Sequence, residues 1–433
     1  MHHAAPPSTS TRDVAGDVAG FYDRYPYPPP VANLDRYRQL WADPAKRRAD
    51  YHLHWPTAPY REDRSILVAG CGTSQAAKHA MRWPDAEVTG IDLSSTSVRC
   101  TEDLRRTYGL DNLTVHHLPI EAVGELGCSF DQIICTGVLH HLADPDAGLR
   151  ALRDVLTPDG AMHLMVYAPY GRTGVYMLQE FCRRLGIGAT DDSIRELIAA
   201  LGALPPGHPL EHLLREAPDF RDEGALADAL LHPQDRAYSV PQFLDFVEGA
   251  GLTMHRWVRQ AAYSAHCGVL AQIPQAATLA LLSTPEQAAA AELFRGTMVR
   301  HSAIVHHAGH PSAPAGGGLP DAEWLSAVPI RLPDTICVQE RLPAGAAGVL
   351  INRAHTSRDV YLPIDAGEQQ VFDEIDGSAS VGDLAIRAAQ RAASPAPVQA
   401  TRAFFERLWW HDQVVFDRSR CAATPSVRPG GAP

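Results

Sequence analysis

Short apolar runs alternate with amphipathic stretches along the middle of the chain, and this alternation is the feature that most limits its fold. Strands in parallel sheets are joined by helices through right-handed crossovers, and the helices cover both faces of the sheet. We therefore expect an α/β domain with a Rossmann-like, doubly wound, mostly parallel sheet. The predicted strands are 66–69, 86–91, 113–117, 130–135 and 161–167, and the predicted helices are 75–82, 97–108 and 145–156.

The alternation is interrupted once and then resumes. Residues 171–237 contain helical segments but no regular strand pattern, and a segment of that length at the carboxyl edge of a sheet often forms a lid or a substrate pocket. A helix at 241–250 follows, with strands at 252–259 and 298–306. The expected sheet therefore has seven strands and a helical insertion.

Changes in composition suggest further parts on either side of this domain. Residues 308–320 are rich in Gly, Pro and Ala and are typical of a linker. Beyond them we expect strands near 336–341, 348–352 and 414–416 and helices at 368–375, 381–391 and 398–410, which make a small α+β domain. The predicted parts are an N-terminal arm without regular pattern at its start (1–59), the α/β domain (60–307), the linker, the small domain (321–420) and a tail (421–433).

Charge and cysteine usage exclude several kinds of partner. The 50 acidic residues outnumber the 38 Lys and Arg, and the formal net charge of -12 at pH 7 disfavours nucleic acid. No apolar run reaches the roughly 18 residues of a membrane span, and no signal peptide is recognisable. The eight cysteines form no CxxC pair. We therefore expect a soluble, cytoplasmic protein without a disulfide framework or a zinc cage.

A glycine-rich turn follows the first predicted strand. Gly70 and Gly72 let the backbone turn sharply and let a ligand approach the main chain, and Asp92 at the end of the second strand can accept hydrogen bonds from both ribose hydroxyls. This arrangement favours an adenosine-bearing cofactor. The third glycine of the dinucleotide fingerprint is replaced by Gln75, which disfavours close packing of a pyrophosphate, although NAD remains an alternative.

The turn is part of an ordered series of motifs. They are Gly70-Cys71-Gly72-Thr73, Asp92, the Leu-Pro-Ile-Glu of 118–121, the strand and turn of 130–142 and the Leu-Thr-Pro-Asp-Gly of 156–160. In this order and spacing they resemble the motifs of class I S-adenosylmethionine-dependent methyltransferases, tightly over about 60–170 and loosely to 307. The resemblance implies a Rossmann-like fold and S-adenosyl-L-methionine as the cofactor.

The resemblance also implies which residues bind that cofactor. The glycines would pass beneath its methionine part, and Asp92 would hold its ribose. Ile120 and Glu121 would flank the adenine. The full set is Gly70, Cys71, Gly72, Thr73, Gln75, Asp92, Leu93, Ile120, Glu121, Thr136 and Gly137, of which the last two would lie beside the methyl group.

Two positions depart from the family pattern. Val68 stands where an acid is usual, and Ser74 stands where a third glycine is common. Recognition of the methionine ammonium would then fall to backbone carbonyls or to Gln75.

Candidate catalytic residues lie just beyond the fourth and fifth predicted strands. A base is needed only if the methyl acceptor must lose a proton. His140 and His141 follow the fourth strand, where an imidazole can act as a base near neutral pH, and the resemblance implies His141 in particular. Tyr170 is the third candidate. Arg172 could bind an acceptor carboxylate or phosphate, or it could pair with an acid of the insertion.

Several of these side chains also have structural alternatives. Each histidine could instead cap a loop or pack in the core. Tyr22, Tyr25 and Tyr27 could cover the cofactor or form an arm packed on the surface. We expect no metal site, because the remaining histidines lie on or beside strands without an acid at ligand spacing.

The C-terminal part shows a second and shorter resemblance. Residues 372–377, 381–384 and 403–410 are similar to small winged-helix peptide-recognition domains. Such a domain could dock a peptide, dimerise the chain or support a lid, so a homodimer stays open. The sequence predicts methyl transfer to a small molecule; the alternatives are a peptide or protein methyltransferase with the C-terminal domain as docking module, and a non-catalytic adenosine-binding regulator.

Overall fold

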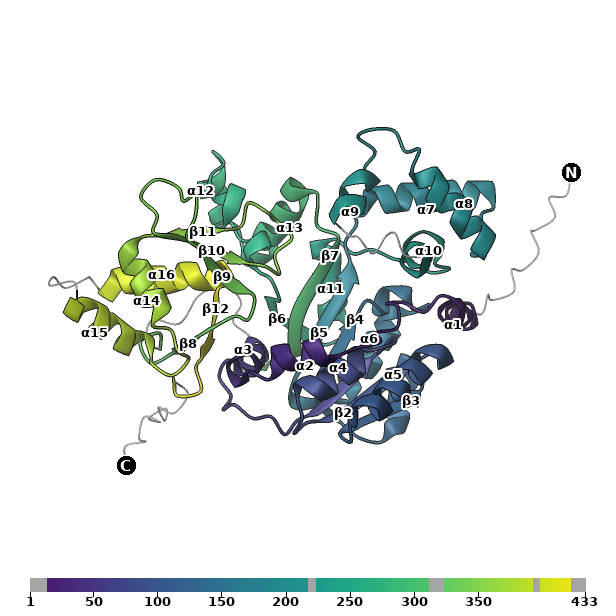
Figure 1. The fold of residues 1–433 in the computed structure, drawn as a ribbon, viewed down its shortest axis with the longest axis horizontal. Coiled ribbons are helices and arrows are strands. Elements are labelled where there is room, and N and C mark those ends of the chain that lie inside the picture. Colours follow the sequence, from purple (N-terminus) through teal and green to yellow (C-terminus); the bar gives the residue numbers. More distant parts are fainter. Residues whose placement is uncertain (1–13, 217–222, 311–322, 392–397, 422–433) are drawn as a thin grey trace, which may run out of the picture.

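The computed structural model describes residues 14–216, 223–310, 323–391 and 398–421. A seven-stranded sheet forms its centre, in the order β3-β2-β1-β4-β5-β7-β6 (Figure 1). The first five strands in sequence pair in parallel, and β7 runs antiparallel between β5 and β6. The strands are β1 (Ser65–Ala69), β2 (Glu87–Asp92), β3 (Leu113–His117), β4 (Phe130–Thr136), β5 (Leu156–Tyr167), β6 (Leu252–Trp257) and β7 (Arg300–His307). The predicted fold class is confirmed.

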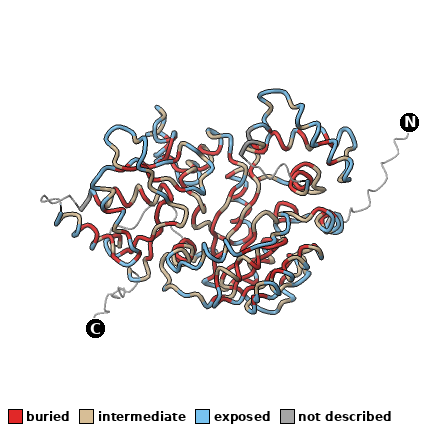
Figure 2. Tube along the Cα trace, viewed as in Figure 1, coloured by how far each residue is buried: buried red, intermediate tan, exposed pale blue. Residues whose placement is uncertain are grey.

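Helices cover both faces of this sheet because alternate strand residues point to opposite sides. In β1, Leu67 and Ala69 belong to the core cluster on one face, whereas Ile66 and Val68 belong to the cluster on the other. The covering helices are α4 (Gln75–Arg82), α5 (Ser95–Tyr108), α6 (Pro145–Asp154), α11 (Val240–Gly249) and α13 (Thr284–Arg295), with short η1 (Ile120–Leu126) and η2 (Leu139–His141). The tube in Figure 2 shows the buried trace concentrated in the sheet.

Local sequence signals explain where these helices begin. Asp144 caps α6 by accepting from the Ala147 amide, and Pro145 occupies the first turn. Ser94 caps α5 in the same way, and Gly109 ends it in the left-handed conformation. The helix predicted at 97–108 therefore begins earlier, at Ser95.

The insertion is helical, as its sequence suggests. It contains α7 (Thr173–Leu185), α8 (Asp191–Leu201), α9 (Leu210–Glu216) and α10 (Glu223–Leu231). These helices share a core cluster with Phe21 of α1 (Val14–Arg24) and with Tyr25 just after it. The irregular N-terminal stretch that the sequence predicts therefore gives way to helix at Val14, because α1 has an apolar face to bury against the insertion.

The rest of the N-terminal segment packs into the main body. Its helices are α2 (Asp35–Trp41) and α3 (Pro44–His54). Tyr51 and Leu53 of α3 share one core cluster with β1 and with Ile330, Leu332 and Val415 from the C-terminal part. The N-terminal segment therefore links the sheet to the C-terminal part.

The C-terminal part is a small α+β unit with its own core. That core includes Trp324, Phe372, Phe404 and Phe405. Its elements are β8 (Val328–Arg331), β9 (Thr335–Val338), β10 (Gly348–Asn352), β11 (Leu362–Ile364), β12 (Val414–Asp417), α14 (Ala366–Asp373), α15 (Val381–Arg391) and α16 (Val398–Trp410). Strands β9 to β11 form one sheet, and β8 pairs with β12.

Two short helical stretches and α12 complete the connection between β6 and α13. They are η4 (Ala261–Tyr263), η5 (Gly268–Ala271) and α12 (Ala276–Ala280). Most of the predicted linker and nearly all of the predicted tail lie outside the described residues. Within the described ranges, every helix is too short or too polar to cross a bilayer.

Candidate active site

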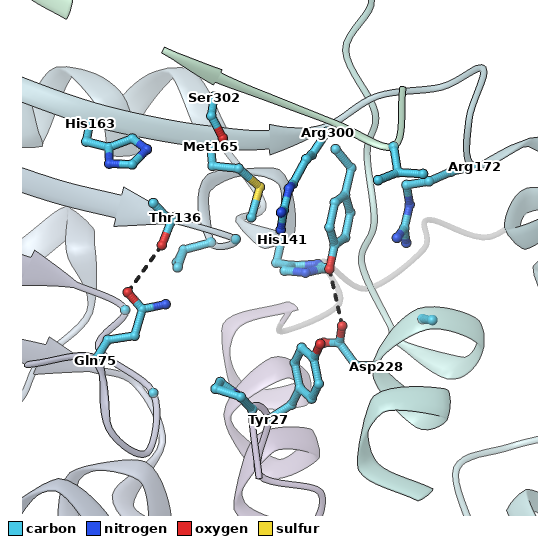
Figure 3. Close-up of a pocket in the computed structure, with 18 of the residues that line it drawn as sticks. Tyr27, Gln75, Thr136, His141, His163, Met165, Arg172, Asp228, Arg300 and Ser302 are labelled. Carbon is cyan, nitrogen blue, oxygen red and sulfur yellow. Dashed lines mark hydrogen bonds between the residues drawn. The ribbon is translucent and has the colours of Figure 1, made fainter. Parts of the chain in front are cut away.

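A cavity of about 740 Å³ opens at the carboxyl ends of the parallel strands. Besides the ends of the sheet strands, its walls include α1, the turn after β1, the helical insertion, and Ala354 to Ser357 of the C-terminal part. Figure 3 shows side chains from several of these regions pointing into the same space. This is the edge of a doubly wound sheet where ligands bind.

The turn after β1 has a backbone that only glycine accommodates easily. Gly70 and Gly72 have φ angles of 67° and 54°. A Cβ at Gly70 would lie 2.3 Å from the Cγ2 of Val138. The turn is therefore constrained twice, by its left-handed backbone and by the residue packed over it.

Asp92 supports this turn and faces the cavity. Its Oδ2 accepts from the Gly72 amide at 2.7 Å, and its Oδ1 accepts from the Ser94 amide at 2.8 Å. Burial raises the pKa of Asp92, and the two amide bonds offset part of that effect. Each carboxylate oxygen keeps a second lone pair, so the group can still accept from the two hydroxyls of a ribose.

Most of the predicted cofactor residues lie around one end of the cavity. Those that line it are Gly70, Gly72, Gln75, Asp92, Leu93, Ile120, Glu121, Thr136 and Gly137. Gln75 accepts from the Thr136 hydroxyl at 3.3 Å, which connects the turn after β1 with the end of β4 (Figure 3). Glycine, apolar and acidic groups in this arrangement fit an adenosine bearing a polar side chain.

Two of the predicted cofactor residues face elsewhere. Cys71 is fully buried beneath the turn, close to Gly90 of β2. Thr73 donates its hydroxyl to the carbonyl of Pro28 at 2.8 Å. Neither residue lines the cavity. The glycines on each side of Cys71 turn the backbone so that the Cys71 side chain points into the core.

The tyrosine and proline segment forms part of the cavity wall. Tyr22, Tyr27 and Pro28 line the cavity. Asp23 accepts from the Ser94 hydroxyl at 2.7 Å and from the Thr96 amide at 3.0 Å, which fastens α1 to the start of α5. Tyr22 and Tyr27 are therefore placed as a cover, whereas Tyr25 bonds Asp191 of the insertion at 2.8 Å.

A buried polar group occupies the opposite end. Asp228 of α10 accepts from the Tyr22 hydroxyl at 2.7 Å and from the Tyr167 hydroxyl at 3.3 Å. Burial raises the pKa of Asp228. Arg172 lies 3.6 Å above the Tyr167 ring and pairs with Asp235 at 3.3 Å. Of the two alternatives for Arg172, the structure has the ion pair with an acid of the insertion.

The three candidate catalytic residues have different surroundings. His141 lines the cavity, and its Nδ1 bonds the Gln234 carbonyl at 2.7 Å. Burial lowers its pKa. His140 is fully buried between His141 and Tyr167, away from the cavity wall. Tyr170 is 41% exposed and does not line the cavity, so a catalytic role for it is not supported.

Several residues of the site lack a sequence motif. The insertion provides Asp228, Asp235 and His232. Later segments provide Arg259, Arg300 and residues 354–357. One signal was available for Asp228. It is the only acid after the first residue of α10, in an otherwise apolar helix, and an isolated acid on an apolar helix usually has a buried partner.

Comparisons with known proteins agree with this geometry. A family model described as a methyltransferase domain matches residues 67–162. An uncharacterised protein of Synechococcus sp. is 34% identical over 248 residues, which cover 54% of this chain and 58% of that protein. A ubiquinone biosynthesis O-methyltransferase of Bordetella avium is 29% identical over 144 residues, which cover 30% of this chain and 58% of the relative. The chain thus spans less than two thirds of these two relatives.

A solved structure extends the likeness of the fold beyond the methyltransferase motifs. PKMT2 from Rickettsia typhi, in complex with AdoHcy, aligns with a TM-score of 0.61 and 15% identity, covering 87% of this chain and 76% of that one.

The fold and the match to the family model indicate the same class of protein. Residues 67–162 form a methyltransferase domain within a seven-stranded, Rossmann-like sheet. The ordered motifs of this segment resemble those of the S-adenosylmethionine-dependent class.

Proposed function

We propose that the chain is an S-adenosylmethionine-dependent methyltransferase that acts on a small-molecule acceptor. The observation that carries this proposal is one continuous cavity that joins the glycine turn and Asp92 to the polar group around Asp228. When bound, S-adenosylmethionine supplies an activated methyl group on a sulfonium. The protein therefore has mainly to hold and align the two reactants.

The cofactor end has groups suited to each part of this molecule. Asp92 accepts from the ribose hydroxyls, and Ile120 and Glu121 contact the adenine. Gln75 offers an amide to the methionine part, where its carbonyl oxygen can accept from an ammonium once the bond from Thr136 is exchanged. Tyr27 and Pro28 exclude water from this end.

The acceptor end has groups that can position a polar molecule and take its proton. Asp228, Tyr22 and Tyr167 form a hydrogen-bonded set at the wall. His141 is uncharged at neutral pH because burial lowers its pKa below the ordinary 6.5, so it is free to accept a proton. This matters for an acceptor such as a hydroxyl, which loses a proton on methylation.

The C-terminal part supports a second candidate function. Ala354, His355, Thr356 and Ser357 line the cavity, so the C-terminal part contributes to the cavity wall. A peptide or protein bound to that part could present a side chain to the cavity. In this alternative the C-terminal part is a docking module, as its short resemblance to peptide-recognition domains implies.

We also propose that the protein acts in the cytoplasm and has no nucleic-acid partner. All eight cysteines are free thiols, which suits the reducing cytoplasm. The net charge of -12 at pH 7 disfavours nucleic-acid partners. Size-exclusion chromatography with light scattering would decide between a monomer and a homodimer.

Two experiments test the proposal. Calorimetry with S-adenosylmethionine, S-adenosylhomocysteine and NAD should give heat of binding for the first two only; binding of NAD alone would overturn the cofactor assignment. A screen of metabolite pools for a methyl mass gain should then find the acceptor. Hydroxyl compounds come first, since several curated relatives are named O-methyltransferases. Cofactor binding without turnover on any small molecule or peptide pool would favour the adenosine-binding regulator.

A further inference from the structure

Imidazole and carboxylate side chains converge beside the acceptor end of the cavity. His140, His141 and Asp235 each offer one nitrogen or oxygen atom, and these three atoms lie within 4.8 Å of one another. The side chain of Asp235 is 4% exposed, and both histidines are buried. Figure 3 shows His141 between Arg300, Arg172 and Asp228.

Atoms of this group lack hydrogen-bond partners among the described residues. They are both ring nitrogens of His140, Nε2 of His141 and Oδ1 of Asp235. Buried polar atoms nearly always have a partner, so several unpaired atoms in one small volume call for an explanation. Each residue of the group contributes at least one of them.

The outer hydrogen bonds orient these atoms. The Gln234 carbonyl accepts from Nδ1–H of His141, which leaves the lone pair on Nε2. Gln179 and Arg172 donate to Oδ2 of Asp235 and leave Oδ1 unpaired. The Arg236 amide donates to the His140 carbonyl at 3.1 Å and joins the loop after α10 to η2. Such outer bonds are a regular feature of metal sites, where they fix the tautomer and direction of each ligand.

The local charges also favour a cation. Asp228 and Asp235 place two carboxylates beside His140, His141 and His232, and only Asp235 of the two has an arginine ion pair among the described residues, with Arg172 at 3.3 Å. Neutral imidazole and ionised carboxylate are the forms that bind metal.

A neighbouring group, His141 with Asp228 and His232, has the same spacing but fewer unpaired atoms. Asp228 already accepts from Tyr22 and Tyr167, and Nδ1 of His232 accepts from the Gln234 amide. A cation there would have to displace some of these bonds. The group with His140 and Asp235 is therefore the better site.

We propose that His140, His141 and Asp235 bind a divalent transition-metal cation, for which zinc is the best match. Two imidazoles and one carboxylate suit zinc, whereas magnesium and calcium prefer oxygen ligands alone. Three protein ligands leave one position of a tetrahedral site for another group. The cation uses the Nε2 lone pair of His141, so binding metal and accepting a proton are alternative states of this residue.

Metal binding by the full chain tests the proposal. Protein stripped with a chelator is titrated with zinc chloride by calorimetry, and bound zinc is counted by mass spectrometry after dialysis. We expect one equivalent per chain. His140→Gln and Asp235→Asn should each weaken binding by at least about tenfold. His116→Gln, at an exposed histidine of β3, is the matched control and should bind zinc like the parent.

Cobalt gives a readout that does not depend on the variants folding. The parent protein loaded with Co²⁺ should show the strong visible absorption of a four-coordinate site. A spectrum like that of aqueous cobalt, no stoichiometric zinc in the parent, or equal zinc affinity in the parent and in a folded His140→Gln variant would overturn the proposal. Circular dichroism and S-adenosylmethionine affinity report whether each variant is folded.

Discussion

The two ends of the cavity are built in different ways. The cofactor end uses residues that follow β2, β1 and β4, which are neighbours in the sheet, so its parts are close in sequence and rest on a rigid sheet. The rest of the cavity wall, with the acceptor end, joins α1, the insertion, β7 and a C-terminal loop, which are far apart in sequence. This difference suggests that the first end is dictated by the fold, whereas the second sets the choice of acceptor.

The largest expected effect comes from the glycine turn. Gly70→Ala places a Cβ against Val138 and also strains the left-handed backbone. We expect a loss of stability of at least about 2 kcal/mol and no measurable cofactor binding. Thermal unfolding and calorimetry measure the two. Gly109→Ala is the matched control, since Gly109 has φ 58° but nothing within 4 Å of its Cβ position. Equal destabilisation by both substitutions would contradict the packing argument.

A substitution of His141 should come next in size. For a hydroxyl acceptor, His141→Gln should lower kcat by about a hundredfold and leave cofactor affinity unchanged. Because burial lowers the pKa of His141 below 6.5, the imidazole stays able to accept a proton as the pH falls to that value. Turnover of the parent should therefore decline only below pH 6.5, and the variant should lose this decline. A pH profile of kcat tests both statements, with His266→Gln as a control; an unchanged profile would exclude His141 as the base.

A smaller effect is expected at Asp228. Asp228→Asn removes an acceptor for one of the two tyrosine hydroxyls and should lower kcat/KM by about tenfold at constant cofactor affinity. Asp191→Asn is the matched control, because Asp191 also accepts from a tyrosine, Tyr25, but outside the cavity. A change in cofactor affinity, with kcat/KM for the acceptor unchanged, would show that Asp228 acts at the cofactor end and contradict its assignment to the acceptor end.

The C-terminal loop should give the smallest effect. His355 lines the cavity and bonds Asp412 through Nε2 at 3.0 Å. His355→Ala should raise the KM for the acceptor by about threefold to tenfold with cofactor affinity unchanged. Steady-state kinetics on the identified acceptor provide the measurement. If a peptide substrate were affected and small molecules were not, the docking alternative would replace the main proposal.

Much of the fold could be predicted because its signals are local. Apolar strands, capping residues and the glycine turn each depend on neighbouring residues, so β1 to β5 lie where the alternation places them. Boundaries moved by a few residues, as at Ser95, where the cap decides. Helix α1 was missed because Phe21 on its apolar face is buried against the insertion, which is distant in sequence.

The site could be predicted only in part. Gly70, Gly72 and Asp92 were found because a motif contains them. Cys71 belongs to the same motif, yet its side chain is buried because the direction of a turn residue depends on its neighbours' φ angles.

The rest of the cavity wall was hard to predict from the sequence, both for neighbouring residues and for residues far apart in the chain. His140 and His141 lie on a single short turn, yet only His141 lines the cavity. Asp228 and residues 354–357 reach the cavity only through tertiary packing, which no local pattern records.

The most direct test of the account is the affinity of Asp92→Ala for S-adenosylmethionine. Asp92 is the one acid at the cofactor end that both faces the cavity and holds the glycine turn. Asp159→Ala, at a side chain that is 97% exposed, serves as the control. Calorimetry should show affinity weakened by at least about tenfold for Asp92→Ala, the value of one charge-assisted hydrogen bond or more. Binding as tight as that of the parent would contradict the account.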